Sequence, residues 1–205
     1  MRNIIIIGNG GHAKSCCDVI ELEKKFKIIG FISSDKNLEI KSNKYLYLGT
    51  DKNLMNIRKR CDSAFVAIGH IKNNSIRKKI FRKLYELKFK TPKIVSPKSY
   101  VSKSSKILEG TIIMHGAVVN AGAIIQKNCI INSNSLIEHD CSIGENCHIS
   151  TGAVVNGHTW IGDNSFIGSN STIQQSVKIE KNCFVNANIF INKDLKKNTR
   201  VIKKK

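Results

Sequence analysis

The feature that most constrains this chain is a six-residue period that runs through its second half. From Val101 to Ile191, every sixth residue is Ile or Val, at sixteen consecutive positions. Neither an α-helix, with 3.6 residues per turn, nor a simple alternating strand calls for this period. A parallel β-helix does, because each six residues form one flat side of a triangular coil and the aliphatic side chain points inward. The period therefore predicts a β-helix of roughly five coils.

A second register supports this interpretation. Four residues after most of the aliphatic positions the side chain is small: Ser, Thr, Ala or Cys. Four of the seven cysteines fall there, at Cys129, Cys141, Cys147 and Cys183, so we interpret them as buried fillers of a narrow prism. The chain has no C-x-x-C pair, which the common structural zinc sites favour, and we expect no such site.

The first half follows a different pattern, in which strands and helices alternate. Buried strands are expected at 4–7, 28–32 and 64–68, with a short one at 45–48. Helices are expected from His12 to about Lys25, over 51–60 and over 75–88. This alternation predicts a small parallel sheet flanked by helices, a Rossmann-like α/β domain. We therefore expect two domains, 1–96 and 97–205, that divide near Pro97.

Charge and hydropathy narrow the class of protein. The net charge is +19, but the lysines are scattered, the cluster at the C-terminus is short, and no aromatic residues interleave with basic runs. A nucleic-acid partner is therefore disfavoured, and anionic small molecules fit the charge. The longest apolar run near the N-terminus, Ile4 to Ile7, is too short for a membrane span or a signal peptide. We expect a cytoplasmic protein.

Several motifs make the whole chain resemble one family. Its repeat resembles that of the hexapeptide-repeat acyltransferases, [LIV]-G-x-x-x-x, at Ile143-Gly144, Ile161-Gly162 and Ile167-Gly168. Together with the two-domain order, two segments make the chain similar to the sialic acid O-acetyltransferase (NeuD) family: Gly8-Asn9-Gly10-Gly11-His12 and Ile137-Glu138-His139-Asp140-Cys141. That family includes the bacterial N-acetyltransferases of UDP-linked 4-amino sugars in bacillosamine synthesis. The resemblance implies a left-handed β-helix, a homotrimer, acetyl-CoA as co-substrate and no metal.

The resemblance also implies roles for individual residues. His139 corresponds to the general base, a role that suits histidine near neutral pH, and Asp140 to the acidic residue that orients it and raises its basicity. The implied acetyl-CoA contacts are His148, Ser169 and Ala187. The implied substrate contacts are Gly10, Gly11, His12, Ser33, Ser34, Asp35 and Gly69. A glycine-rich turn that opens a helix also suits a phosphate on physical grounds, although a tight turn without a ligand remains an alternative.

Spacing along the β-helix leads to a prediction about assembly. His148 follows His139 by nine residues, half of an eighteen-residue coil, so the two face different directions within one chain. Adjacent subunits of a trimer remove this difficulty, because a cleft between two prisms can draw on two faces. The resemblance to trimeric γ-class carbonic anhydrases fails, because the required pair of histidines five residues apart is missing. His115 and His158 match no motif and are interpreted as surface residues, and His70 is a further candidate near the glycine loop.

Two departures from the family leave the substrate open. Where relatives that use UDP-amino sugars carry two adjacent acidic residues, this chain reads Ser33-Ser34-Asp35, and its C-terminus lacks the usual G-V-P-A-[KR] loop. The leading prediction is N-acetylation of the 4-amino group of a nucleotide-linked amino-deoxy sugar, for surface polysaccharide or glycan synthesis. The alternatives are O-acetylation of sialic acid or a related sugar, and a non-catalytic protein that binds sugar nucleotides. UDP, dTDP and GDP all remain possible nucleotides.

Overall fold

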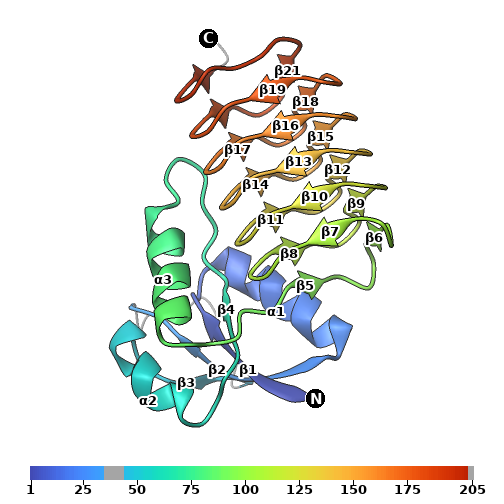
Figure 1. Ribbon diagram of the computed structural model, residues 1–205. Coiled ribbons are helices and arrows are strands. Elements are labelled where there is room, and N and C mark those ends of the chain that lie inside the picture. The colour runs from blue at the N-terminus through green and yellow to red at the C-terminus, as the bar shows by residue number, and fades with distance from the viewer. Residues whose placement is uncertain (35–43, 203–205) are drawn as a thin grey trace. The chain divides into compact units, whose positions relative to one another are not determined.

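The computed structural model describes residues 1–34 and 44–202, and the predicted substrate contact Asp35 lies outside these ranges. The chain folds into two compact units, Met1–Val95 and Ser96–Lys205. Figure 1 traces the elements of each unit in chain order. Each unit is described by itself below.

The first unit is an α/β fold around one parallel sheet. Four strands pair in the order β3-β2-β1-β4, and every pairing is parallel. The elements of this unit are β1 (Arg2–Ile7), α1 (Gly11–Glu23), β2 (Phe26–Ile32), β3 (Leu46–Tyr47), the 3₁₀ turn η1 (Asp51–Asn53), α2 (Leu54–Arg58), β4 (Ala64–Val66), α3 (Ser75–Glu86) and β5 (Ile94–Val95). The expected helix over 51–60 is therefore a 3₁₀ turn that continues as five residues of α-helix.

The sheet is held by a core of aliphatic side chains. The run from Ile4 to Ile7 is almost wholly buried, as expected for a central parallel strand covered on both faces. Helix α3 contributes Ile80 and Leu84 to this core. None of the helices in the described part of the chain is long and apolar enough to span a bilayer.

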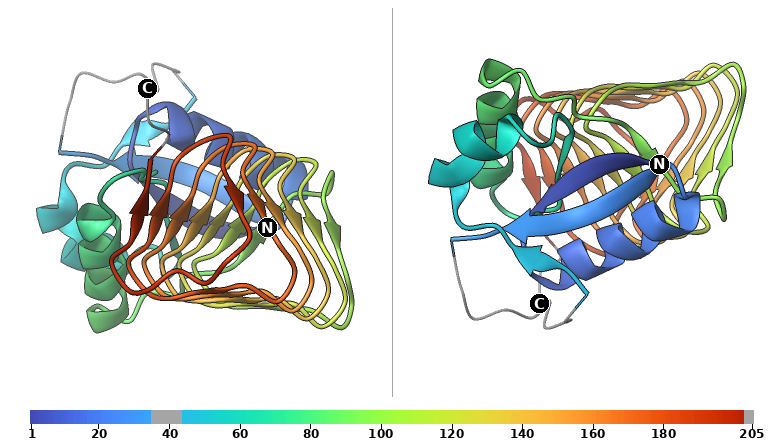
Figure 2. Two further views of the ribbon diagram at one scale, coloured as in Figure 1. Left: turned by 90° about the horizontal axis from the view of Figure 1, so that it is seen from above. Right: turned by 90° about the horizontal axis from the view of Figure 1, so that it is seen from below.

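The second unit stacks short parallel strands in three sheets, the arrangement of a left-handed β-helix of hexapeptide repeats. Seen from above, its coils lie one over the next (Figure 2). The first sheet holds β6 (Tyr100–Val101), β9 (Val118–Val119), β12 (Leu136–Ile137), β15 (Val154–Val155), β18 (Thr172–Ile173) and β21 (Phe190–Ile191). The second holds β7 (Lys106–Ile107), β10 (Ile124–Ile125), β13 (Ser142–Ile143), β16 (Trp160–Ile161) and β19 (Lys178–Ile179). The third holds β8 (Ile112–Ile113), β11 (Ile130–Ile131), β14 (His148–Ile149), β17 (Phe166–Ile167), β20 (Phe184–Val185) and β22 (Arg200–Val201).

The two sequence registers form the core of this prism. Paired strands align residues eighteen apart, for example Ile125 with Ile143 and Ile143 with Ile161, and all three side chains are fully buried. The cysteines of the small-residue register are buried and free. Their thiols donate to carbonyls of the next coil, as Cys147 does to Gly162 at 3.3 Å. The predicted fold and the predicted role of these cysteines are confirmed.

The corners between strands use a third register, which the sequence analysis did not single out. At every sixth residue from Gly110 to Asn188 the backbone adopts the left-handed conformation, with φ between 54° and 72°. Gly and Asn fill most of these positions, because they tolerate positive φ at little cost. The exceptions are Asp140, His158 and Ser176. These three residues lie in one column, on consecutive coils.

Candidate active site

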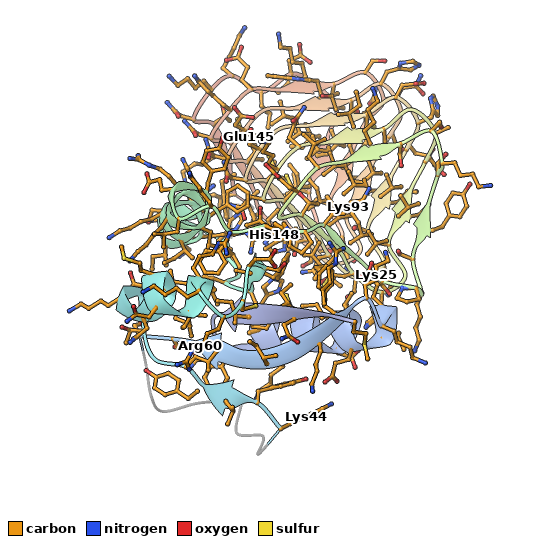
Figure 3. All side chains as sticks on the ribbon, turned by 60° about the horizontal axis from the view of Figure 1, so that its bottom comes forward. Lys25, Lys44, Arg60, Lys93, Glu145 and His148 are labelled. Atoms are coloured by element: carbon orange, nitrogen blue, oxygen red, sulfur yellow. The ribbon has the colours of Figure 1, made fainter. Side chains whose placement is uncertain are left out.

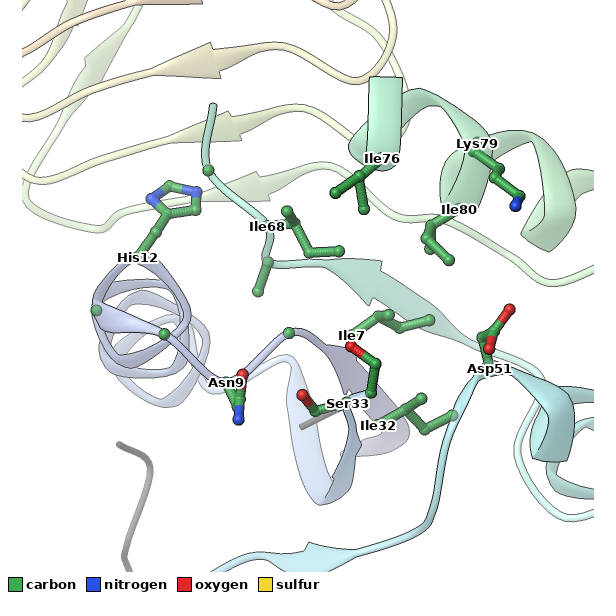
Figure 4. Close-up of a pocket in the computed structure, with 16 residues that line it drawn as sticks. Ile7, Asn9, His12, Ile32, Ser33, Asp51, Ile68, Ile76, Lys79 and Ile80 are labelled. Atoms are coloured by element: carbon green, nitrogen blue, oxygen red, sulfur yellow. The ribbon is translucent and has the colours of Figure 1, made fainter. Parts of the chain in front are cut away.

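In the first unit, a pocket of about 630 Å³ lies at the carboxyl ends of the parallel strands. Open α/β sheets bind ligands at this edge, where the strand order reverses. Six of the predicted substrate contacts line the pocket: Gly10, Gly11, His12, Ser33, Ser34 and Gly69. Figure 4 shows His12 and Ser33 at its wall, with Asp51 and Lys79 across from them. The structure therefore brings the described members of that set together.

The glycines of the loop differ in what the fold demands of them. Gly8 has φ of +119°, and a Cβ there would lie 2.9 Å from the carbonyl oxygen of Ala67. The chain itself therefore requires a glycine at this position. At Gly10 and Gly11 a Cβ would meet nothing within 4 Å. Packing within the chain does not explain these two glycines, and a ligand that approaches the backbone closely would.

The loop leads directly into the N-terminus of α1. Gly10 is the N-cap residue and provides no side-chain cap, and the first turn carries no acidic residue. An uncapped helix N-terminus favours an anion, through its backbone N–H groups and the helix dipole. This end of the pocket is therefore suited to phosphate.

Gly69 has a local packing role. A Cβ at Gly69 would lie 3.2 Å from Cβ and Cγ of His12, so its absence leaves room for the imidazole. The ring Nε2 of His12 lies 3.4 Å from Sγ of Cys16, one turn further along α1. Burial raises the pKa of the Cys16 thiol far above its ordinary value, so this sulfur stays protonated.

Three polar residues near this pocket were missed by the sequence analysis. Asp51 and Lys79 line it, and Asp51 pairs with Lys83 at 2.9 Å, a hydrogen bond that holds the pKa of the Asp51 carboxyl below its ordinary value. Arg77 is fully buried and donates to the carbonyl oxygens of Val66 at 2.6 Å and Ile68 at 3.0 Å. Arg77 therefore fixes the end of β4, next to the pocket. From sequence, Arg77 is one of several basic residues in the same helix, and nothing in its position indicated this role.

In the second unit, His139 and Asp140 form a close pair at the corner between β12 and β13. His139 Nδ1 lies 2.9 Å from Asp140 Oδ2, and the two side chains are 49% and 52% exposed. Because the carboxylate accepts from Nδ1–H, the lone pair of the neutral ring is on Nε2. A carboxylate in this position orients the ring and stabilises the imidazolium. The pair can therefore accept a proton from a bound nucleophile.

Neighbouring coils support this pair from both sides. The N–H of Asp140 donates to Ala121 O at 2.9 Å. On the other side, a Cβ at Gly157 would lie 2.7 Å from Cε1 and Nε2 of His139, so the imidazole lies against a position without a side chain. Glu138 accepts from the N–H of His139 at 3.3 Å and from Asn120 Nδ2 at 2.9 Å.

His158, interpreted from sequence as an isolated surface residue, lies beside the pair. Its ring meets that of His139 edge to face, with centroids 5.1 Å apart, and its Nε2 lies 3.8 Å from Asp140 Oδ2. It follows Asp140 by eighteen residues, so the coil length would have placed the two residues in one column. His139, Asp140 and His158 together are a group of side chains able to hold a metal ion.

The predicted acetyl-CoA contacts lie elsewhere on the β-helix. His148 is on β14 in the third sheet, 6% exposed, with Nε2 3.1 Å from Asn132 Nδ2 and its ring edge to face with Phe166. Ser169 and Ala187 occupy equivalent corners on consecutive coils, and Ser169 Oγ lies 3.0 Å from Ser150 Oγ. The half-coil separation of His148 from His139 is thus present in the structure.

The other histidines considered from sequence, His70 and His115, belong neither to the pocket of the first unit nor to the His139–Asp140 pair. His70 is buried and is not among the residues that line the pocket, and His115 Nδ1 lies 2.6 Å from Ser96 Oγ. Basic residues such as Lys25, Lys44 and Lys93 are exposed on separate segments of the first unit (Figure 3). The positive charge of that unit is therefore spread over its surface.

Comparisons with known proteins agree with this geometry. The family described as the PglD N-terminal domain matches residues 3–84, and hexapeptide-repeat families of bacterial transferases match residues 122–157 and 159–193. Fold and site thus define a hexapeptide-repeat acyltransferase with an α/β domain of the PglD type. A search of curated proteins gave no match.

Solved structures narrow this class to a family. One similar structure is the acetyltransferase domain of PglB from Neisseria gonorrhoeae FA1090, in complex with acetyl coenzyme A. It is 30% identical to this chain in sequence, the match covers 95% of this chain and 92% of that one, and the TM-score is 0.85. A His-to-Asn variant of perosamine N-acetyltransferase from Caulobacter crescentus, in complex with CoA and GDP-perosamine, is 26% identical, with 99% and 94% covered and a TM-score of 0.92. WeeI from Acinetobacter baumannii AYE, at 23% identity, 99% and 97% coverage and a TM-score of 0.84, shares the fold. The chain belongs to the family of bacterial nucleotide-amino-sugar acetyltransferases.

Proposed function

We propose that this protein transfers an acetyl group from acetyl-CoA to the 4-amino group of a nucleotide-linked amino-deoxy sugar, for surface polysaccharide or glycan synthesis. The observation that carries the proposal is the His139–Asp140 pair, with Nδ1 held by the carboxylate and Nε2 left as the proton acceptor. Family membership supplies the acyl donor and the class of acceptor. The N-acetyltransferases among the solved relatives favour an amine over a sialic acid hydroxyl.

In the proposed mechanism His139 acts as general base. The amine of the sugar attacks the thioester carbonyl, and Nε2 accepts the proton that the nitrogen loses as the new C–N bond forms. Asp140 stabilises the positive charge that then develops on the ring. The C–S bond breaks, and the CoA sulfur leaves as a thiolate that takes the proton from the imidazolium, which returns the histidine to its neutral form. Amide, CoA thiol and neutral histidine are the products.

The pocket of the first unit is proposed to hold the nucleotide-sugar, so that residues 1–96 form the substrate domain and 97–205 the acetyltransferase domain. The N-terminus of α1, with Gly10 and Gly11, suits the diphosphate. Ser33 and Ser34 line the same pocket and offer hydroxyl groups to a base or ribose, and Asp35 is proposed to act beside them. His12 and Gly69 complete the proposed contacts.

Acetyl-CoA is proposed to lie along His148, Ser169 and Ala187 of one subunit and to present its thioester to His139 of a neighbour in a homotrimer. Two observations support a shared site. His148 lies half a coil from His139, and Ser169 and Ala187 lie two thirds of a coil from it once whole coils are subtracted. The outward face of the first sheet, beside the His139 corner, carries a column of apolar side chains interrupted by Thr172, in which Tyr100 and Phe190 are 60% and 61% exposed. Sedimentation should give a trimer, and a fully active monomer would contradict the shared site.

A cytoplasmic location is proposed as well. All seven cysteines are free and buried, as suits a reducing compartment. Measuring the protein in fractionated cells tests this proposal directly, and recovery of the protein from an extracytoplasmic fraction would contradict it.

The decisive experiment is mass spectrometry of candidate sugar nucleotides incubated with the protein and acetyl-CoA. The panel holds UDP-, dTDP- and GDP-linked 4-amino sugars, each matched with the same nucleotide sugar carrying a 4-hydroxyl group. We expect a mass gain of one acetyl group on an amino member, with no gain on its hydroxyl match. Acetylation of the hydroxyl compounds, or of free sialic acid, would favour the O-acetyltransferase alternative. Binding without turnover of any member would favour the non-catalytic one.

A further inference from the structure

The corner that carries the proposed base holds three potential metal ligands from two consecutive coils. Asp140 Oδ2 lies between the two imidazoles, 2.9 Å from His139 Nδ1 and 3.8 Å from His158 Nε2. The ligand atoms of the three residues all lie within 4.8 Å of one another. Their side chains are 49%, 52% and 56% exposed, so an ion from solvent can reach them.

The backbone that holds these ligands is fixed by the β-helix. The N–H of His158 donates to His139 O at 3.0 Å, and the N–H of Asp140 donates to Ala121 O at 2.9 Å. Sites built on regular elements keep their ligands more precisely than sites on free loops. The hydrogen-bonded backbone therefore holds the three side chains within reach of one ion.

The identity of His158 is a second, independent observation. It occupies a left-handed corner position, with φ of 57°, where all the other corners of this register except Asp140 and Ser176 have Gly or Asn. Non-glycine residues are uncommon in this conformation, although histidine adopts it more readily than most, and residues held in it cluster at functional sites. Gly157, directly before it, leaves the space in which the ring of His139 lies. The Gly157–His158 step thus accommodates the base and adds an imidazole on its Asp140 side.

We propose that His139, Asp140 and His158 bind a divalent transition-metal ion of the Zn²⁺ class. Two imidazoles and one carboxylate match the ligands that zinc and its neighbours prefer, whereas Mg²⁺ and Ca²⁺ require sites made largely of oxygen. Water fills the remaining coordination positions. The established family chemistry needs no metal, so this ion is a regulator of the site and not its cofactor.

The ion would switch off the base through its tautomer, a consequence that rests on the proposed function. With Zn²⁺ on Nδ1, the hydrogen bond to Asp140 is lost and the single proton of the neutral ring moves to Nε2. Nε2 then donates and can no longer accept a proton from the amine. A cation in the site also binds the Asp140 carboxylate, which then no longer stabilises the imidazolium.

The other soft ligands of the chain compete poorly for the ion. Cys141, the nearest cysteine in sequence, is 1% exposed, so an ion from solvent does not reach its sulfur. Glu138 is engaged by Asn120 Nδ2 and by the backbone N–H of His139. His115, the remaining partly exposed histidine of the described second unit, lies against Ser96 on another corner.

The test is calorimetric titration of the metal-free trimer with Zn²⁺, without substrates, on the parent protein and three variants. We expect one ion per subunit, with affinity lowered about tenfold or more by His158→Gln and by Asp140→Asn, the scale on which disturbing a zinc site acts. The matched control His115→Gln should bind as the parent does. Co²⁺ should give a visible absorption band that His158→Gln loses. Unchanged binding in His158→Gln, or the same loss in His115→Gln, would overturn the proposal.

A second measurement separates this site from the proposed reaction. Acetyl transfer is measured with and without stoichiometric Zn²⁺, and each variant is compared with itself, so that differences in basal rate cancel. Inhibition of the parent and its relief in His158→Gln would support both the site and the base. Binding without inhibition would uphold the metal site and overturn His139 as the base. Inhibition that persists in His158→Gln would overturn the site.

Discussion

Replacing Gly157 with alanine tests whether His139 must occupy its observed place. The new Cβ would lie 2.7 Å from Cε1 and Nε2 of the imidazole, whereas ordinary contact begins at about 3.5 Å. The ring must therefore retreat by about 0.8 Å, which takes Nε2 away from its present position. A misplacement near 1 Å costs catalysis about 100-fold, so we expect kcat to fall by about that factor.

Stability should change little in Gly157→Ala, which makes the variant informative. The backbone of Gly157 lies outside the left-handed region, so it accepts an alanine, and the gain from a less flexible unfolded chain is about 0.4–1 kcal/mol. Against this stands the cost of turning a half-exposed ring from its rotamer, about 0.5–1.5 kcal/mol. The two effects nearly cancel. Thermal unfolding should therefore lie close to that of the parent protein.

The assay is steady-state release of CoA thiol, combined with a double-mutant cycle. If Gly157 acts through His139, the variant with both Gly157→Ala and His139→Ala should be no slower than His139→Ala alone. Additive losses would show that Gly157 contributes in another way. A Gly157→Ala protein with the parent kcat would refute the idea that the position of the imidazole limits the reaction.

Three further predictions follow from the same geometry. His139→Ala should lower kcat by about 10²–10⁴-fold with little change in KM, and Asp140→Asn should cost less; a loss under about threefold would remove His139 from the mechanism. Gly10→Ala should raise KM for the sugar nucleotide about tenfold at unchanged thermal stability, whereas Gly8→Ala should lower stability by about 1–3 kcal/mol. Burial raises the pKa of Cys141 to about 11, so stability should fall as pH rises from 9 to 11, because the unfolded chain ionises first; Cys141→Ala should make this fall smaller, and the other buried cysteines with raised pKa values should account for the rest.

The fold was predictable because its signal is repeated. One aliphatic residue in six says little, but sixteen in succession exclude a helix and a plain sheet. Because a coil has three sides of six residues each, residues eighteen apart pair with each other, as Ile143 does with Ile125 and Ile161. The prediction of a helix over 51–60 was less accurate. There the local sequence begins with a 3₁₀ turn capped by Thr50, and α2 ends at Arg58.

The candidate site was predictable in part, because a motif identifies functional residues but not the residues that lie beside them in the fold. The segment Glu138-His139-Asp140 indicated a base and its carboxylate from sequence alone. His158 was missed because it matches no motif, although adding eighteen to Asp140 gives its position. The distinction between Gly8 and Gly10 was also out of reach. It depends on whether Ala67 approaches the missing Cβ, a contact between two strands that the spacing of glycines does not encode.

The stacking of coils explains how one corner can hold this chemistry without weakening the fold. Corner residues lie against residues eighteen positions away, as Gly122 does against Asp140 and Gly157 against His139, while the buried aliphatic register carries the hydrophobic core. Gly122, Asp140 and His158 form one such column, and Ala121, His139 and Gly157 form the next. A change in either column therefore alters the base, its carboxylate or their support, and leaves the core untouched. For the same reason, substitutions at this corner should separate activity from stability, whereas substitutions at Ile143 or Ile161 should affect both.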